Sequence, residues 1–287
     1  MQYFLVSTNH LDNKVWFKDE DDFKMAMNAV AIYVTLLGIR VLAFILMSNH
    51  VHFVLYCSRA DAEHFINEFK RHCSRYIQHK YGTKELLRKN EVDIRVVENE
   101  NESLERAIAY VQMNSVAANI CLHPSAYPWG SGKCFFCAET VKASRVTTLS
   151  AAARYRLLHS KLPVSDKLLL GPGGFILPES YVEVEGVERL FRSAKRMQYF
   201  LTSSSKSKRI LETGESVGPA FRDQVIIAAL GDMCRTLFQK QGLSALTETE
   251  LAELFRQIRY RFSSNVHQIA RVTGYSYQDV AGLMDRL

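Results

Sequence analysis

The sequence lacks an apolar run long enough to cross a membrane, and it lacks a basic leader. Its longest apolar stretch, Val41 to Met47, is far shorter than the ~20 residues that a membrane helix requires. The first residues, Met1 to Val6, place no positive side chain ahead of an apolar segment, so no signal peptide is indicated. We therefore expect a cytoplasmic protein with no membrane partner.

Cysteine is also scarce, with six copies spread through 287 residues. Without a signal peptide to direct the chain into an oxidising compartment, we expect these thiols to be reduced. Hydrophobic residues make up 47% of the chain and charged residues 23%, which is ordinary for a folded protein and argues against global disorder. The length favours one larger domain and one smaller accessory domain.

The excess of positive charge is moderate. A net charge of +6 and an isoelectric point of about 8.9 suit a polyanionic partner such as nucleic acid. Many proteins that never contact nucleic acid have the same balance, so charge alone leaves the partner open.

Alternating strand and helix patterns fill residues 1–135. Short runs rich in β-branched and aromatic residues predict strands over Tyr3 to Ser7, Val41 to Met47, Val51 to Tyr56 and Val92 to Val97. Apolar residues at helical spacing predict helices between the acidic run Asp19 to Asp22 and Gly38, over Ala60 to Tyr81, and over Ser103 to Ile120. The order β-α-β-β-α-β-α predicts an α+β fold of the ferredoxin-like kind, with helices on one face of an antiparallel sheet.

Residues 136–215 show no sustained pattern and are predicted to be a linker and irregular basic region. The run Gly171 to Gly174 breaks any helix or strand, and the stretch Arg189 to Arg209 is basic and rich in serine. This places an α+β domain over 1–135 and an all-helical domain over 216–287.

The helical domain ends in a pattern typical of a helix-turn-helix. A small residue, Ala270, precedes the turn glycine Gly274 by four positions, and Ser276 can cap the second helix. If this unit contacts DNA, we expect the contacts to come from Arg271, Tyr277 and Gln278. The alternative is an ordinary pair of packed helices that contacts no DNA.

Basic side chains on the helix predicted over 60–81 form a second candidate contact with DNA. Lys70, Arg71 and Arg75 lie within about five residues of one another and can meet phosphates. The alternative is a solvated helix face, because surface helices normally carry charge.

The candidate chemistry begins with two histidines, His50 and His52, at the start of a strand. Side chains at positions i and i+2 of a strand point to the same face, so the two imidazoles converge and can bind one divalent ion. On the helix predicted over 103–120, Tyr110 and Asn114 lie one turn apart on one face. An amide oxygen is a suitable third ligand for a hard cation, and a phenol beside it can attack a phosphate held there.

Three segments together resemble a known family. They are Met-Ser-Asn-His-Val-His-Phe-Val-Leu over 47–55, Tyr-Val-Gln-Met-Asn-Ser-Val-Ala-Ala-Asn over 110–119, and Tyr-Pro-Trp-Gly-Ser over 127–131. In this order they resemble the tyrosine transposases of the IS200-like type, most of all the REP-associated tyrosine transposases. The resemblance covers residues 1–135 and implies a ferredoxin-like HUH nuclease domain. Family members usually carry proline where this chain has Ser48 and Ser115.

The resemblance implies roles for four residues. It assigns His50, His52 and Asn114 as ligands of Mg²⁺ or Mn²⁺ and Tyr110 as the catalytic nucleophile. The implied activity is a single-strand DNA endonuclease and strand transferase that forms a 5′-phosphotyrosine on hairpin-containing DNA. Whether the active form is a monomer or a homodimer stays open.

Several alternatives remain at this stage. One is an HUH nickase that acts at a replication or transfer origin, and another is a non-catalytic, domesticated DNA-binding regulator. The thiols and imidazole of Cys121, His123, Cys134 and Cys137 are possible zinc ligands, although their spacing is not a standard one. The segment Gly130 to Lys133 lacks the preceding glycine of a phosphate-binding loop, which excludes that kind of nucleotide site.

Overall fold

The computed structural model describes residues 1–8, 15–83, 91–137, 141–203, 221–262 and 264–285. Its largest sheet contains β1 (Gln2–Thr8), β2 (Arg40–Leu46), β3 (Val51–Cys57) and β4 (Val92–Val97), in the order β2-β3-β1-β4. Every neighbouring pair is antiparallel. The predicted α+β class and the order β-α-β-β-α-β are confirmed for these elements.

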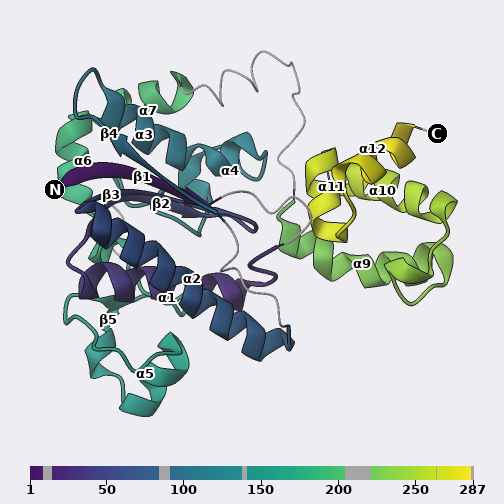
Figure 1. Ribbon diagram of the computed structural model, residues 1–287, viewed down its shortest axis with the longest axis horizontal. Coiled ribbons are helices and arrows are strands. Elements are labelled where there is room, and N and C mark those ends of the chain that lie inside the picture. Colours follow the sequence, from purple (N-terminus) through teal and green to yellow (C-terminus); the bar gives the residue numbers. More distant parts are fainter. Residues whose placement is uncertain (9–14, 84–90, 138–140, 204–220, 263, 286–287) are drawn as a thin grey trace.

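Two long helices, α1 (Glu20–Leu36) and α2 (Arg59–Tyr81), pack together on one face of the sheet (Figure 1). A capping box at Asp19 begins α1, and the side chain of Ser58 caps α2. Gly82 ends α2 with φ +64°, a left-handed conformation that favours glycine. The rings of Phe65 and Phe69 on α2 pack edge-on against Phe53 of β3.

The opposite face of the sheet is covered as well, by α3 (Ser103–Gln112) (Figure 1). The prediction of helices on one face only was therefore wrong. The reason is visible in β2 and β3, whose residues are buried almost without alternation, so that both faces need a covering layer. The single helix predicted over 103–120 also ends earlier than expected and is followed by the short α4 (Asn114–Ala117).

The prediction of an irregular linker over 136–215 differs from the structure over 141–203. This part contains β5 (Ser144–Arg145), η3 (Val146–Thr148), α5 (Ala151–Leu158), β6 (Leu169–Leu170), η4 (Pro178–Ser180), α6 (Val184–Phe191) and α7 (Ala194–Ser203). Apolar residues at helical spacing on α6 and α7 join the core of the main sheet, among them Val187, Phe191, Phe200 and Leu201. The side chain of Asn28 connects α1 to the segment that contains α5 and β6. It donates a hydrogen bond to the carbonyl of Leu157 and accepts one from the backbone N–H of Ile176.

Residues 221–262 and 264–285 contain helices that surround a separate apolar core. They are α9 (Asp223–Phe238), η5 (Leu243–Ala245), α10 (Glu248–Phe262), α11 (Val266–Thr273) and α12 (Tyr277–Asp285), and Pro124–Ala126 forms the short η2 between α4 and β5. Gly274 ends α11 with φ +81°, and the hydroxyl of Ser276 accepts a hydrogen bond from the backbone of Asp279. The structure therefore has the two predicted helices joined by a short turn, and Ala270 is buried where α11 meets its neighbours. Within the described ranges, no helix combines the length and the apolar character needed to span a bilayer.

Candidate active site

The two histidines meet on the face of the sheet that α3 covers. His50 lies in the turn that joins β2 to β3, and its carbonyl accepts a hydrogen bond from the backbone of Met47 at 2.9 Å. His52 is the second residue of β3 and lies opposite Ser7 of β1. Both imidazoles are buried, with ring centroids 4.9 Å apart and ring planes at 82°. The hairpin thus brings the two side chains together as the i, i+2 spacing predicts.

A hydrogen bond from the neighbouring residue orients His50. The distance between His50 Nδ1 and the Asn49 side-chain oxygen is 2.8 Å. A side-chain carbonyl oxygen can only accept, so Nδ1 carries the proton and Nε2 carries the lone pair of the neutral ring. This is the arrangement by which a second residue fixes the tautomer of a metal-binding imidazole.

Tyr110 reaches the histidines from α3. Its ring lies edge-on to that of His52, with centroids 5.5 Å apart and an interplanar angle of 84°. Burial raises the pKa of the Tyr110 phenol above its ordinary value, and the positive charge of Arg95 opposes that rise. Tyr110 is half-buried, so its hydroxyl is protonated at neutral pH.

Arg95 is a site residue that the sequence did not reveal. It belongs to β4 and lies opposite Leu5 of β1, while Asp93 lies opposite Ser7. Because Ser7 also faces His52 in register, Asp93 and Arg95 project from the same face of the sheet as the histidine pair. The alternation along β4 was readable in the sequence, but the position of β4 beside β1 was not.

Asn114 begins α4, one turn after Tyr110. Its buried amide nitrogen donates to the backbone carbonyls of Tyr110 at 2.9 Å and Val111 at 3.2 Å. These bonds hold the amide nitrogen on the helix and leave the side-chain oxygen as the atom with ligand chemistry. No group of three or more His, Cys, Asp or Glu that could hold a metal occurs among the described residues. A metal here would therefore depend on two imidazole nitrogens and one amide oxygen.

The basic residues of α2 lie on the other side of the sheet from the histidine pair. Helix α2 packs against Phe53 of β3. Neighbouring residues of a strand point to opposite faces of the sheet, so α2 and His52 lie on opposite faces. Lys70 is buried, which lowers the pKa of its amine, and Arg71 pairs with Glu68 at 2.9 Å. Arg75 is exposed. The structure does not bring these three side chains into one site with Tyr110.

Arg271 also differs from its expected placement. Its guanidinium faces inward and holds the carboxylate of Asp223, through Nε at 2.6 Å and Nη2 at 3.0 Å. Gln268 donates to the same carboxylate at 2.9 Å, and the hydroxyl of Ser48 donates to it as well. Two of the three guanidinium nitrogens of Arg271 therefore hold an internal carboxylate, and its contact with DNA stays a prediction.

The other two helix-turn-helix residues lie at the surface. Tyr277 and Gln278 are exposed at the start of α12, and the Tyr277 ring lies against that of His267 with centroids 4.5 Å apart. Both side chains are thus accessible to a partner.

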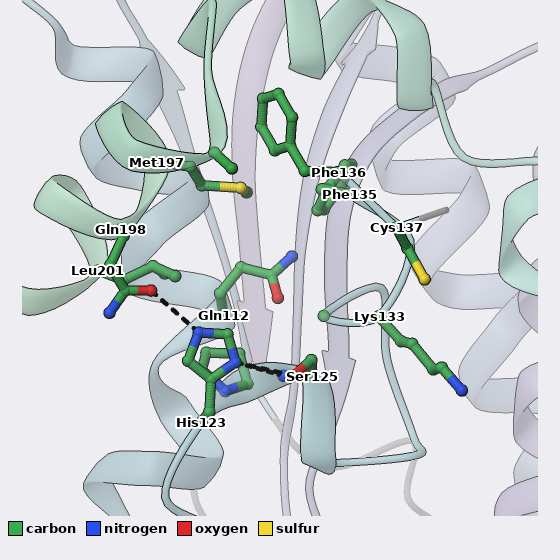
Figure 2. Close-up of a pocket in the computed structure, with 13 residues that line it drawn as sticks. Gln112, His123, Ser125, Lys133, Phe135, Phe136, Cys137, Met197, Gln198 and Leu201 are labelled. Carbon is green, nitrogen blue, oxygen red and sulfur yellow. Dashed lines mark hydrogen bonds between the residues drawn. The ribbon is translucent and has the colours of Figure 1, made fainter. Parts of the chain in front are cut away.

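The four proposed zinc ligands do not converge. A pocket of about 380 Å³ lies between residues 123–137 and α7, and in it the His123 ring points to Gln198 at 3.1 Å and Ser125 at 2.8 Å (Figure 2). Cys137 points away from that ring (Figure 2). The thiol of Cys121 bonds instead to the hydroxyl of Ser115 at 3.3 Å. The zinc interpretation was wrong for these residues.

The chain has few detectable similarities to known proteins. No family model matches the chain, and no curated protein matches it. A solved structure described as a REP-associated tyrosine transposase bound to a REP hairpin is similar over 45% of this chain and 76% of that chain, with 13% identity and a TM-score of 0.38.

Proposed function

We propose that the protein is a transposase-like single-strand DNA endonuclease and strand transferase with an HUH nuclease domain and Tyr110 as its nucleophile. The observation that carries this proposal is the convergence of three side chains from separate elements. His50 and His52 lie 4.9 Å apart, and the Tyr110 ring lies 5.5 Å from His52. A phenol beside two buried imidazoles suits attack on a phosphodiester held at a cation.

The reaction that fits this arrangement is a transesterification. The Tyr110 oxygen forms a bond to phosphorus while the bond from phosphorus to the 3′ oxygen of the preceding nucleotide breaks. The products are a 5′-phosphotyrosine and a free 3′-hydroxyl, which receives a proton. One phosphodiester replaces another, so a second 3′-hydroxyl can attack the phosphotyrosine and rejoin the strand.

The phenol must lose its proton during the attack. Its pKa is raised by burial, so a phenolate is rare at neutral pH before the substrate binds. Arg95 stabilises the developing negative charge, because it is the cation that lowers this pKa. We assign the lone pair at His50 Nε2 to a cation, because the hydrogen bond between Nδ1 and Asn49 orients the ring as a second residue orients a metal-binding imidazole.

The proposed cofactor is Mg²⁺ or Mn²⁺, held by His50, His52 and Asn114. When bound, such an ion supplies positive charge that polarises the scissile phosphate. The proposed substrate is single-stranded DNA, including DNA that forms hairpins.

The test is covalent adduct formation on denaturing gels, with Mn²⁺ and a labelled single-stranded oligonucleotide that contains a hairpin. The wild-type chain should form an adduct that survives denaturation, and Tyr110→Phe should form none. Tyr155→Phe is the matched control, because Tyr155 is an exposed tyrosine on α5, which packs on α1 across the sheet. An adduct that persists in Tyr110→Phe would refute the assignment of the nucleophile.

A second candidate is a non-catalytic regulator that binds duplex DNA. It is favoured by the turn at Gly274, which joins α11 to α12, and by the exposure of Tyr277 and Gln278 at the start of α12. Duplex binding that is lost in Tyr277→Ala, in a protein that forms no adduct, would support this candidate instead.

A further inference from the structure

A groove of about 680 Å³ lies beside Tyr110, outside the histidine pair. Its walls come from the end of β4, from α3 and from α7. The residues that matter below are Arg106 and Tyr110 on α3, Glu98 after β4, and Tyr199 and Phe200 on α7. The volume is within the range of pockets that hold a small organic group.

The α7 wall presents an aromatic ring to solvent. Tyr199 is 63% exposed, more than Tyr155, Phe221 or Tyr277. Its ring lies edge-on to the buried ring of Phe200, with centroids 5.5 Å apart and planes at 84°. A rigid support under an accessible ring is what a stacking platform for a nucleobase requires.

The α3 wall presents a cation, Arg106, one helical turn before Tyr110. The Arg106 side chain is 67% exposed, and its guanidinium lies over the Phe200 ring at 6.0 Å. It pairs with Glu102 at 3.1 Å, an exposed contact that contributes little stability and can be exchanged for a phosphate. On the β4 wall, Glu98 carries negative charge, which disfavours a phosphate there. The charge distribution therefore favours a sugar-phosphate backbone along α3.

We propose that this groove binds one unstacked nucleotide of single-stranded DNA next to the scissile phosphate, with the base on Tyr199 and a phosphate at Arg106. The inference rests on the proposed function, because the position of the nucleophile at the groove wall is what brings the strand there. It adds a substrate contact from α7, an element outside residues 1–135. Stacking accepts every base, so this contact holds the strand without selecting a sequence.

The experiment separates stacking from charge. It measures fluorescence anisotropy in the Tyr110→Phe background, where the strand stays intact, at one fixed salt concentration. The two probes are an oligothymidylate of about 12 nucleotides and an abasic strand of the same length and charge. Tyr199→Ala should weaken oligothymidylate binding by about 5- to 100-fold and leave abasic binding unchanged, because one base stack is lost. Tyr199→Phe keeps an aromatic face and should bind as the parent does.

The charge contact has its own signature. Arg106→Gln should weaken both probes to the same extent and reduce the dependence of binding on salt. Tyr155→Ala is the matched control and should change neither probe. Unchanged oligothymidylate binding in Tyr199→Ala overturns the proposal, as does an equal loss for both probes, which indicates a structural role for the ring.

Failure of the groove and failure of the catalytic proposal give different results. If the wild type forms the Tyr110 adduct and Tyr199→Ala binds normally, the groove assignment alone is overturned. If no adduct forms while Tyr199→Ala selectively loses oligothymidylate binding, Tyr199 stands as a base-stacking contact for single-stranded DNA. The catalytic proposal then fails, and with it the placement of the groove beside a scissile phosphate.

Discussion

Replacement of Asp223 by alanine should detach the C-terminal helices from the turn that carries the histidines. The Asp223 carboxylate is 1% exposed and accepts from Arg271, Gln268 and Ser48, so it links α9 and α11 to the hairpin between β2 and β3. Asp223→Ala leaves the Arg271 guanidinium, 14% exposed, without its carboxylate. Breaking a buried ion pair costs about 3–5 kcal/mol, and the partial exposure of Arg271 favours the lower end, about 3 kcal/mol.

The assay is urea denaturation of the full chain, monitored by intrinsic tryptophan fluorescence. Two separate apolar cores allow more than one transition, so the free energy is compared at the first one. The matched control is Asp232→Ala, because Asp232 is 75% exposed in a surface pair with Arg235 and its loss should cost less than about 1 kcal/mol. In a double-mutant cycle, Asp223→Ala with Arg271→Met should cost clearly less than the two single changes added together. A loss below about 1 kcal/mol for Asp223→Ala would refute this account of the link.

Three further predictions concern a buried histidine, a surface arginine and a close backbone contact. Burial lowers the pKa of His72 to about 4, so the chain takes up a proton when it unfolds between pH 4 and pH 6.5. The free energy of unfolding should therefore fall as the pH falls through this window, by at most about 1.4 kcal/mol per pH unit. In denaturation curves His72→Gln should flatten this slope, whereas His64→Gln, at an exposed histidine, should not. Arg95→Gln should slow adduct formation by about threefold at low salt and less at high salt, because it removes the charge that lowers the pKa of Tyr110. Gly132→Ala should destabilise the fold by about 1–3 kcal/mol in thermal unfolding, because the added Cβ would lie 2.4 Å from a backbone oxygen.

Each of these has a contrary outcome. An unchanged pH slope in His72→Gln would mean that other groups carry the acid sensitivity. Faster adduct formation in Arg95→Gln would contradict a stabilising role for its charge. Wild-type stability in Gly132→Ala would show that the backbone at this loop can shift without cost.

The local parts of the fold could be predicted from the sequence. Short runs rich in β-branched and aromatic residues located the four strands, and the hairpin that joins β2 and β3 brought His50 and His52 together as expected. The turn at Gly274 and the cap at Ser276 also follow from local residue preferences. These features depend on contacts within a few residues, which a single sequence shows directly.

The parts that were missed depend on distant contacts. The charge of Arg95 acts on Tyr110 because β4 pairs with β1, and the order of strands in a sheet cannot be read from any one segment. The Arg271 side chain points inward because the carboxylate of Asp223, 48 residues earlier, accepts its hydrogen bonds. The helices α6 and α7 were obscured by the basic and serine-rich composition of their region, although their apolar faces complete the main core. The overall composition of such helices is dominated by their exposed polar residues, so it does not reveal the apolar residues of their buried face.

The position of β4 at one end of the main sheet has a consequence for aggregation. An edge strand offers unpaired backbone groups to other chains, and charged side chains on such a strand discourage that pairing. Asp93 and Arg95 are the charged residues of β4, and they pair with each other at 2.5 Å. The residues nearest the edge therefore protect the chain from joining its sheet to another copy. Neutralising both should lower solubility independently of any effect on Tyr110.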